Sequence, residues 1–204
     1  MTMSLLALVD TSKASLFLSL ASIAFNPTAW NIVARNEYRN KTITRLFGGN
    51  AYLGCYFLAA CIFSAGMLRD HLYRSALLEQ PRVPLLPAPL DTLLPLALFA
   101  TGQTFVVSST WALGVTGTFL GDYFGILMDH RVEGFPFNVL RDPMYVGSTM
   151  CFAATALWYE RPVGLLVTLY VHILYTIALR FEGPFTDMIY STRYTPKKVS
   201  EKEL

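Results

Sequence analysis

The sequence has few charged residues, and it lacks them entirely over long stretches. Asp, Glu, Lys and Arg make up 15% of the 204 residues, against roughly a quarter in an average soluble domain. None of the four occurs in residues 14–34, 46–68, 92–121, 143–159 or 162–179. A helix needs about 20 mainly apolar residues to cross a hydrocarbon layer about 30 Å thick. This shortage of charge excludes an ordinary soluble domain and predicts a polytopic membrane protein.

Cysteine is also scarce, and all three cysteines lie in apolar stretches. They lack the paired spacing of a metal site or a disulfide framework, so they are interpreted as packing residues. No spacing of His, Cys and carboxylates suggests a metal, and none is expected. Basic residues are not interleaved with aromatics along a continuous polar face, which argues against nucleic acid as a partner. No obligatory protein partner is evident.

The apolar stretches predict an all-α fold of four to five membrane-embedded helices, in one domain that covers residues 1–204. The expected segments are 14–34, 46–68, 93–120, 145–159 and 163–180. Asn26 and Pro27 should kink or interrupt the first, because proline removes a helical hydrogen bond and restricts its predecessor. That segment therefore either spans the membrane or re-enters it. Residues 69–91 are expected to form a loop, and residues 186–204 a charged tail.

The last two segments flank Glu160, Arg161 and Pro162, which predicts a helical hairpin. Such a hairpin brings RDPMYVGS, before it, and RFEGPF, after it, to the same membrane face. With five crossings, eleven of the 16 Lys and Arg residues fall on that face. The five on the other are Lys13, Arg69, Arg74, Arg82 and Arg161. The excess predicts a cytosolic position for the polar motifs, an argument that fails if the first segment re-enters.

Ionisable side chains beside membrane segments are candidates for function, because they are costly to place there. Asp122 lies where the third segment ends, and Glu182 lies at the end of the last one. The helix dipole favours a cation at a helix C-terminus, so a carboxylate at position 182 is unexpected for a simple anchor. The alternative interpretation of both residues is an ordinary interfacial carboxylate.

Four motifs carry a resemblance to a known family: FNPTAWNIVAR, GTFLGDYFGILMDHRVEGFPFNV, DPMYVGS and EGPFTDMIY. From about residue 24 to 193 and in this order, they closely resemble the phospholipid N-methyltransferase family, most of all its small fungal members. The resemblance implies methyl transfer from S-adenosylmethionine to phosphatidylethanolamine-type headgroups in the bilayer, here the monomethyl and dimethyl forms, to give phosphatidylcholine. It also implies a multi-pass protein of the endoplasmic reticulum membrane, with the mitochondrial membrane as a second compartment.

The resemblance extends to the residues expected at the cofactor. The family associates S-adenosylmethionine with a Gly-x-Gly segment and with two adjacent glutamates, which align here with Ala100, Thr101 and Gly102 and with Glu182 and Gly183. Only Gly102 and Glu182 match by residue type. Pro143 and Tyr145 resemble the Pro-x-Tyr-x-Gly signature of the wider group that includes isoprenylcysteine carboxyl methyltransferases, and they are expected at the cofactor too.

The chemistry implied by the resemblance assigns further roles. The attacking amine must be neutral, so a base is required, and Glu182 and Asp122 are the catalytic candidates. The methylated headgroup is a cation that aromatic faces attract, and Tyr123, Phe124, Tyr145 and Phe185 are expected to provide them unless they only mark the membrane interface. Two alternatives stay open: a methyltransferase for another acceptor, such as a prenylated carboxyl, and a non-catalytic scaffold, which the departures at Ala100 and Gly183 favour.

Overall fold

The computed structural model describes residues 8–193, which form helices and connections without a strand. The elements are α1 (Ala14–Asn40), α2 (Thr42–Leu46), α3 (Ala51–Leu78), α4 (Leu90–Thr118), the 3₁₀ helix η2 (Gly121–Phe124), α5 (Pro143–Trp158) and α6 (Pro162–Arg193). Four stretches are long and apolar enough to cross a membrane: α1, α3, α4 continued through η2, and α6. The predicted all-α, polytopic fold is confirmed.

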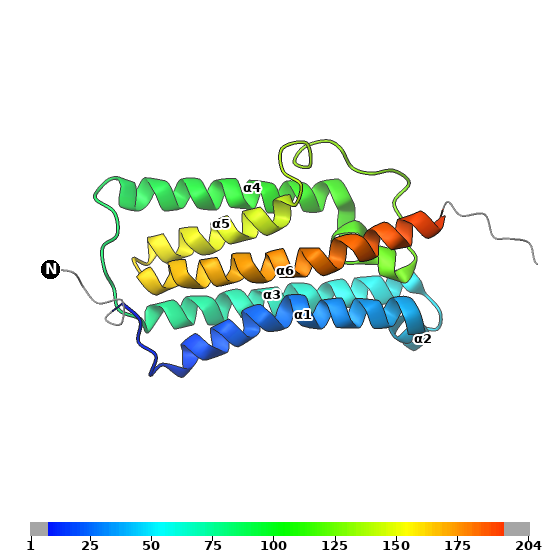
Figure 1. Cartoon of the computed structure of the whole chain (residues 1–204), viewed down its shortest axis with the longest axis horizontal. Coiled ribbons are helices and arrows are strands. Elements are labelled where there is room, and N and C mark those ends of the chain that lie inside the picture. Colours follow the sequence, from blue (N-terminus) through cyan, green and yellow to red (C-terminus); the bar gives the residue numbers. More distant parts are fainter. Residues whose placement is uncertain (1–7, 194–204) are drawn as a thin grey trace, which may run out of the picture.

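The long helices lie side by side along the long axis of the molecule (Figure 1). α1 and α3 form one side, α4 and α5 the other, and α6 runs between them. α5 has only 16 residues, or about 24 Å, and begins near the middle of the bundle. The connection after η2 carries the chain back to that point. The C-terminal ends of α1, α4 and α6 lie at one end of the bundle, called here the η2 end.

The interruption expected at Pro27 does not occur, because α1 is one helix from Ala14 to Asn40. Polar side chains bond to backbone carbonyls around the proline. Asn31 Nδ2 donates to the Pro27 carbonyl at 2.9 Å, and Thr28 Oγ1 donates to the Ala24 carbonyl at 2.8 Å. At 27 residues α1 is long enough to span the membrane, which disfavours the re-entrant alternative.

Two helices extend well beyond their predicted ends. α3 continues to Leu78 rather than 68, so the loop expected over 69–91 is reduced to residues 79–89. α6 continues to Arg193 rather than 180, so the first part of the expected tail is helical, and residues 194–204 lie outside the described part of the chain. The apolar pattern detected only the hydrocarbon-facing length of each helix. The extensions are stabilised by packing instead, since Tyr73, Leu77 and Ile189 are buried.

α4 and α5 meet through two glycines. A Cβ atom at Gly102 would lie 2.6 Å from the Gly147 carbonyl oxygen, and one at Gly147 would lie 2.5 Å from the Gly102 oxygen. In lipid there is no hydrophobic driving force for helices to associate, so they associate through van der Waals contacts where small residues let the backbones approach closely. This contact fixes the short α5 against α4.

The buried carboxylate of Glu37 holds the start of α2. Glu37 is fully buried, and its two oxygens accept hydrogen bonds from the backbone N–H groups of Ile43, at 2.6 Å, and Thr44, at 3.2 Å. Those N–H groups belong to the first turn of α2, where a helix offers them no internal partner. Glu37 thus joins the end of α1 to α2.

Replacing Glu37 with alanine should lower the free energy of unfolding by about 1–3 kcal/mol, because it leaves buried donors without an acceptor. Thermal unfolding in detergent would measure the loss. The exposed Glu133 provides the control, and Glu133→Ala should change stability little. Equal thermal unfolding midpoints for Glu37→Ala and Glu133→Ala would contradict this role of Glu37.

Candidate functional site

A cavity of about 1690 Å³ lies among the long helices, and every one of them contributes to its wall. Ligand pockets usually measure about 300–1,000 Å³, so this one has room for more than one small ligand. Part of its wall on α3 and α4 is apolar, where Phe63, Met67, Leu96 and Phe99 line it. Polar groups gather near the start of α5 and the facing part of α6, and these groups define the candidate site.

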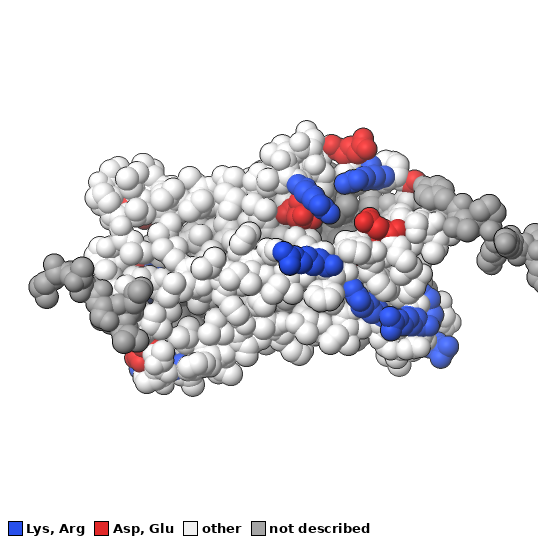
Figure 2. Space-filling model, viewed as in Figure 1, with Lys and Arg blue, Asp and Glu red and all other residues white. Residues whose placement is uncertain are grey.

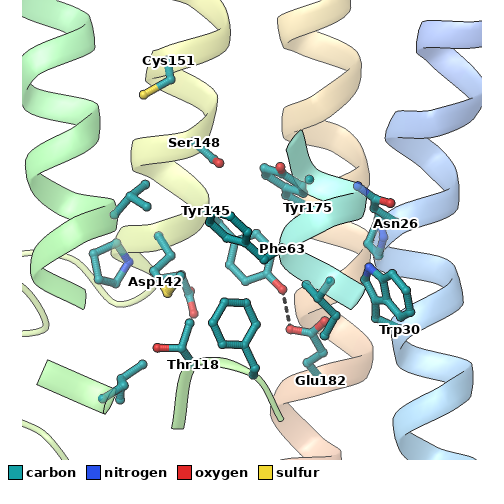
Figure 3. A pocket seen from close by; sticks show the side chains of 18 of the residues that line it. Asn26, Trp30, Phe63, Thr118, Asp142, Tyr145, Ser148, Cys151, Tyr175 and Glu182 are labelled. Carbon is teal, nitrogen blue, oxygen red and sulfur yellow. Dashed lines mark hydrogen bonds between the residues drawn. The ribbon is translucent and has the colours of Figure 1, made fainter. Parts of the chain in front are cut away.

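The centre of this site is the carboxylate of Glu182, which two other helices hold. Tyr145, from α5, donates its hydroxyl to Glu182 Oε2 at 2.5 Å (Figure 3). Asn31, from α1, donates from Nδ2 to Glu182 Oε1 at 2.8 Å. Hydrogen bonds to an ionised carboxylate are short and strong, so both oxygens have fixed positions. The expectation that the hairpin brings DPMYVGS and EGPF together agrees with this contact.

The second predicted carboxylate lies close by. Asp122 belongs to η2, and its Oδ2 accepts a hydrogen bond from Thr186 Oγ1 at 3.1 Å. Thr186 lies one helical turn after Glu182, on the same face of α6. Asp142, just before α5, also lines the cavity, and its neighbour Arg141, 3.9 Å away, has an 85% exposed side chain. This end of the cavity is therefore acidic and suits a cationic ligand.

The residues expected at the cofactor fall into two groups. Glu182, Pro143 and Tyr145 line the cavity, and a Cβ atom at Gly183 would meet nothing within 4 Å. The Ala100, Thr101 and Gly102 segment is different. Ala100 and Thr101 are exposed, and Ala100 borders a separate shallow depression. Gly102 is buried against Gly147.

The four aromatics expected to surround a cation do not all line the cavity. Tyr145 lines the cavity, whereas Tyr123 and Phe124 are buried in the packing and Phe185 stacks on Tyr123 with ring centroids 5.1 Å apart. The guanidinium of Arg35 already lies 4.7 Å from the centre of the Phe185 ring. That expectation was wrong for these three residues, because proximity in sequence to Asp122 or Glu182 does not decide which way a ring points.

Other helices supply residues that sequence reasoning missed. Trp30, Phe63 and Tyr175 lie around Tyr145 and Glu182 in Figure 3, from α1, α3 and α6. Asn31 was missed as well, although an amide inside an apolar run is a signal that could have identified it. Among residues 8–193, no group of three or more His, Cys, Asp and Glu side chains is arranged to hold a metal ion.

The surface charge is distributed unevenly along the bundle. Figure 2 shows Lys, Arg, Asp and Glu gathered over the half of this face towards the η2 end, with uncharged surface over much of the rest. Exposed Phe and Leu side chains along α1, α3 and α4, such as Phe17, Phe57 and Leu93, suit contact with lipid.

Comparison with known proteins shows that the chain matches one protein family and several close relatives. The family model described as phospholipid methyltransferase matches residues 90–193. A phosphatidyl-N-methylethanolamine N-methyltransferase of Neurospora crassa is 59% identical over 91% of this chain and 86% of its own. The enzyme of the same name from Saccharomyces cerevisiae is 53% identical over 93% of this chain and 92% of its own. A phosphatidylethanolamine N-methyltransferase from rat is 46% identical over 94% of this chain and 96% of its own. No solved structure matches the chain.

Proposed function

This chain belongs to the phospholipid methyltransferase family, and on that basis we propose that it methylates phosphatidylethanolamine-type headgroups, using S-adenosylmethionine as methyl donor. The proposed acceptors are the monomethyl and dimethyl forms, and the product is phosphatidylcholine. The similarity to the two fungal enzymes supports this choice of steps. One structural observation carries the proposal: the Glu182 carboxylate, held by Tyr145 and Asn31, faces a large cavity in a membrane-spanning bundle.

The acidic end of the cavity fits both reactants, because the sulfonium of S-adenosylmethionine and the protonated amine are cations. When bound, S-adenosylmethionine supplies an electrophilic methyl group. We assign its binding to Glu182, Gly183, Pro143 and Tyr145, which lie in or beside the acidic end and leave open space at Gly183. Ala100 and Thr101 are left out, because both are exposed and neither lines the cavity.

Glu182 and Asp122 are the proposed catalytic carboxylates. The amine must lose its proton before it attacks, and a positioned carboxylate accelerates such a transfer by about 10²- to 10⁴-fold. Glu182 has both oxygens fixed, so it orients the headgroup nitrogen, and positioning supplies much of the acceleration of a displacement between two bound reactants. Asp122, bonded to Thr186 on the same face of α6, offers a second acceptor for the proton.

Lipid N-methylation accounts for the membrane-embedded architecture. The acyl chains stay in the bilayer while the headgroup reaches the cavity, and the chain has four candidate spans. We propose one methyltransferase domain in the endoplasmic reticulum membrane with the η2 end in the cytosol, as the excess of Lys and Arg there supports. The names of the relatives favour this activity over carboxyl methylation or a scaffold.

Methyl transfer from labelled S-adenosylmethionine in microsomes tests the proposal. Phosphatidylethanolamine and its monomethyl and dimethyl derivatives should be offered separately. Label should enter the phospholipid fraction with the two methylated acceptors and to a much smaller extent with phosphatidylethanolamine. Absence of label in every lipid, from protein shown to be folded, would refute the proposed function. Equal labelling of all three acceptors would refute only the assignment of steps.

A further inference from the structure

An arginine at the end of the apolar stretch of α3 lines the cavity. Arg69 follows the uncharged residues 46–68 and comes nine residues before the end of α3 at Leu78, so it lies roughly 14 Å from that end. Its side chain is only 15% exposed. A largely buried ionisable group beside a membrane-spanning stretch is costly, and it usually faces an interior pathway or site. Neither the family resemblance nor the proposed reaction assigns it a role.

The guanidinium of Arg69 is held on two sides. Nε and Nη2 donate to Asp70 Oδ1 at 2.9 and 2.8 Å, and Nη1 donates to the Tyr175 hydroxyl at 2.9 Å. The ring of Phe152 lies 5.2 Å from the guanidinium carbon. A guanidinium has five N–H donors, and these bonds use three. Among the described residues it makes no further hydrogen bond, and both Arg69 and Tyr175 line the cavity.

Two touching tyrosines connect this arginine with the catalytic centre. The Tyr145 hydroxyl bonds to Glu182, the Tyr145 and Tyr175 rings meet edge to face with centroids 4.9 Å apart, and the Tyr175 hydroxyl bonds to Arg69. A carboxylate and a guanidinium thus face one cavity, separated by about two side chains. A phospholipid amine headgroup carries the two complementary charges, because a two-carbon link joins its cationic nitrogen to an anionic phosphodiester.

We propose that Arg69 binds the phosphodiester of the lipid whose amine lies at Glu182, so that Arg69 determines specificity for phosphate-linked amines. This inference rests on the proposed function. A planar guanidinium can donate two parallel hydrogen bonds to the two non-bridging oxygens of a phosphodiester, which an ammonium does not match. Asp70 occupies the Nε edge of the guanidinium and Tyr175 takes one Nη1 donor, which leaves one N–H on Nη1 and one on Nη2 for the ligand.

Glu182 and Arg69 lie at different depths in the bundle. Glu182 lies 11 residues from the end of α6 on that side, whereas Arg69 lies 18 residues from the start of α3 on the same side. In the proposed complex the phosphodiester therefore lies deeper in the bundle than the amine. The acyl chains then meet the apolar wall of α3 and α4, where Phe63 and Phe99 line the cavity.

Steady-state kinetics of the full-length Arg69→Gln and Arg69→Lys variants test this site. With phosphatidyl-N-methylethanolamine in mixed micelles, the KM for lipid should rise about 10- to 100-fold in Arg69→Gln, as expected for a lost hydrogen bond to a charged group. The kcat should stay within about threefold, and the Kd for S-adenosylmethionine should not change. Arg69→Lys should have an intermediate KM, and it replaces the glutamine variant if that one does not fold. Arg180→Gln, in α6 and away from the cavity, should behave as wild type.

Inhibition by lipids that carry only half of the headgroup separates binding from structural support. Phosphatidylmethanol, a phosphodiester without an amine, should inhibit the wild type competitively and the Arg69 variants far more weakly. N-methylhexadecylamine, an amine without a phosphate, should inhibit all of them equally. Equal inhibition by phosphatidylmethanol, or a fall in kcat at constant KM, would overturn the role of Arg69. Lack of lipid methylation by the wild type would instead refute the proposed function.

Discussion

Glu182→Gln should lower kcat for lipid methylation by about 10²- to 10⁴-fold, the range that a positioned carboxylate contributes to proton transfer. Glutamine keeps the size of the side chain and an oxygen that accepts the hydrogen bond from Tyr145. It removes the negative charge that faces the cavity. Initial rates of methyl transfer from labelled S-adenosylmethionine, with protein checked for an unchanged thermal midpoint, measure the effect.

Controls for this prediction come from the same network and from the surface. Tyr145→Phe and Asn31→Leu each remove one donor to Glu182 and leave the carboxylate in place, so each should cost less than the loss of the charge. Glu133→Gln, at an exposed position, should retain full activity. If Glu182→Gln keeps activity within about twofold of wild type, the carboxylate has no role in the transition state.

The second large effect concerns stability and separates two interpretations of Gly102. Gly102→Ala should lower the free energy of unfolding by about 1–3 kcal/mol, because the added methyl group overpacks a filled contact. Its Cβ atom would lie 2.6 Å from the Gly147 carbonyl oxygen and 2.8 Å from the Cys151 sulfur. Gly102→Leu should prevent α5 from packing on α4 and abolish folding. Thermal unfolding in detergent, with and without S-adenosylmethionine, measures these changes.

A matched glycine in another spanning helix provides the control. A Cβ atom at Gly66, in α3, would meet nothing within 4 Å, and alanine is the better helix former by about 1 kcal/mol. Gly66→Ala should therefore be neutral or stabilising. If Gly102→Ala is as stable as wild type and only weakens binding of S-adenosylmethionine, Gly102 contacts the cofactor and the packing role is refuted.

Much of the candidate site could be predicted from sequence because it consists of residues near the ends of apolar segments. Glu182 and Tyr145 lie 37 residues apart, yet they meet because a hairpin between two apolar runs brings both to the same side of the bundle. Asp122 follows the third run directly and reaches the same cavity. The number of membrane crossings between two such residues decides whether they share a membrane face. That number can be read from the uncharged stretches of the sequence.

Other parts of the site could not be predicted, because they depend on how each helix is rotated about its own axis. Asn31, on α1, contacts Glu182, whereas Phe185, one turn after Phe181, turns to the ring of Tyr123. Apolar side chains are distributed almost evenly around most of the spanning helices, so the sequence pattern does not show which face of each helix is buried. Only the packing of neighbouring helices selects one.

The sequence by itself determined that this chain crosses a membrane several times, that its last two segments form a hairpin, and that Glu182, Asp122 and Tyr145 belong at one membrane face. Solvation explains this, because backbone groups in hydrocarbon must bond within a helix and charge must avoid it. The tertiary structure decided which residues meet. Gly102 packs against Gly147 rather than lining the cavity, and Arg69 bonds to Tyr175 on the cavity wall. Those pairings follow from close contact between helices distant in sequence, and lipid imposes no preference that would reveal them along the chain.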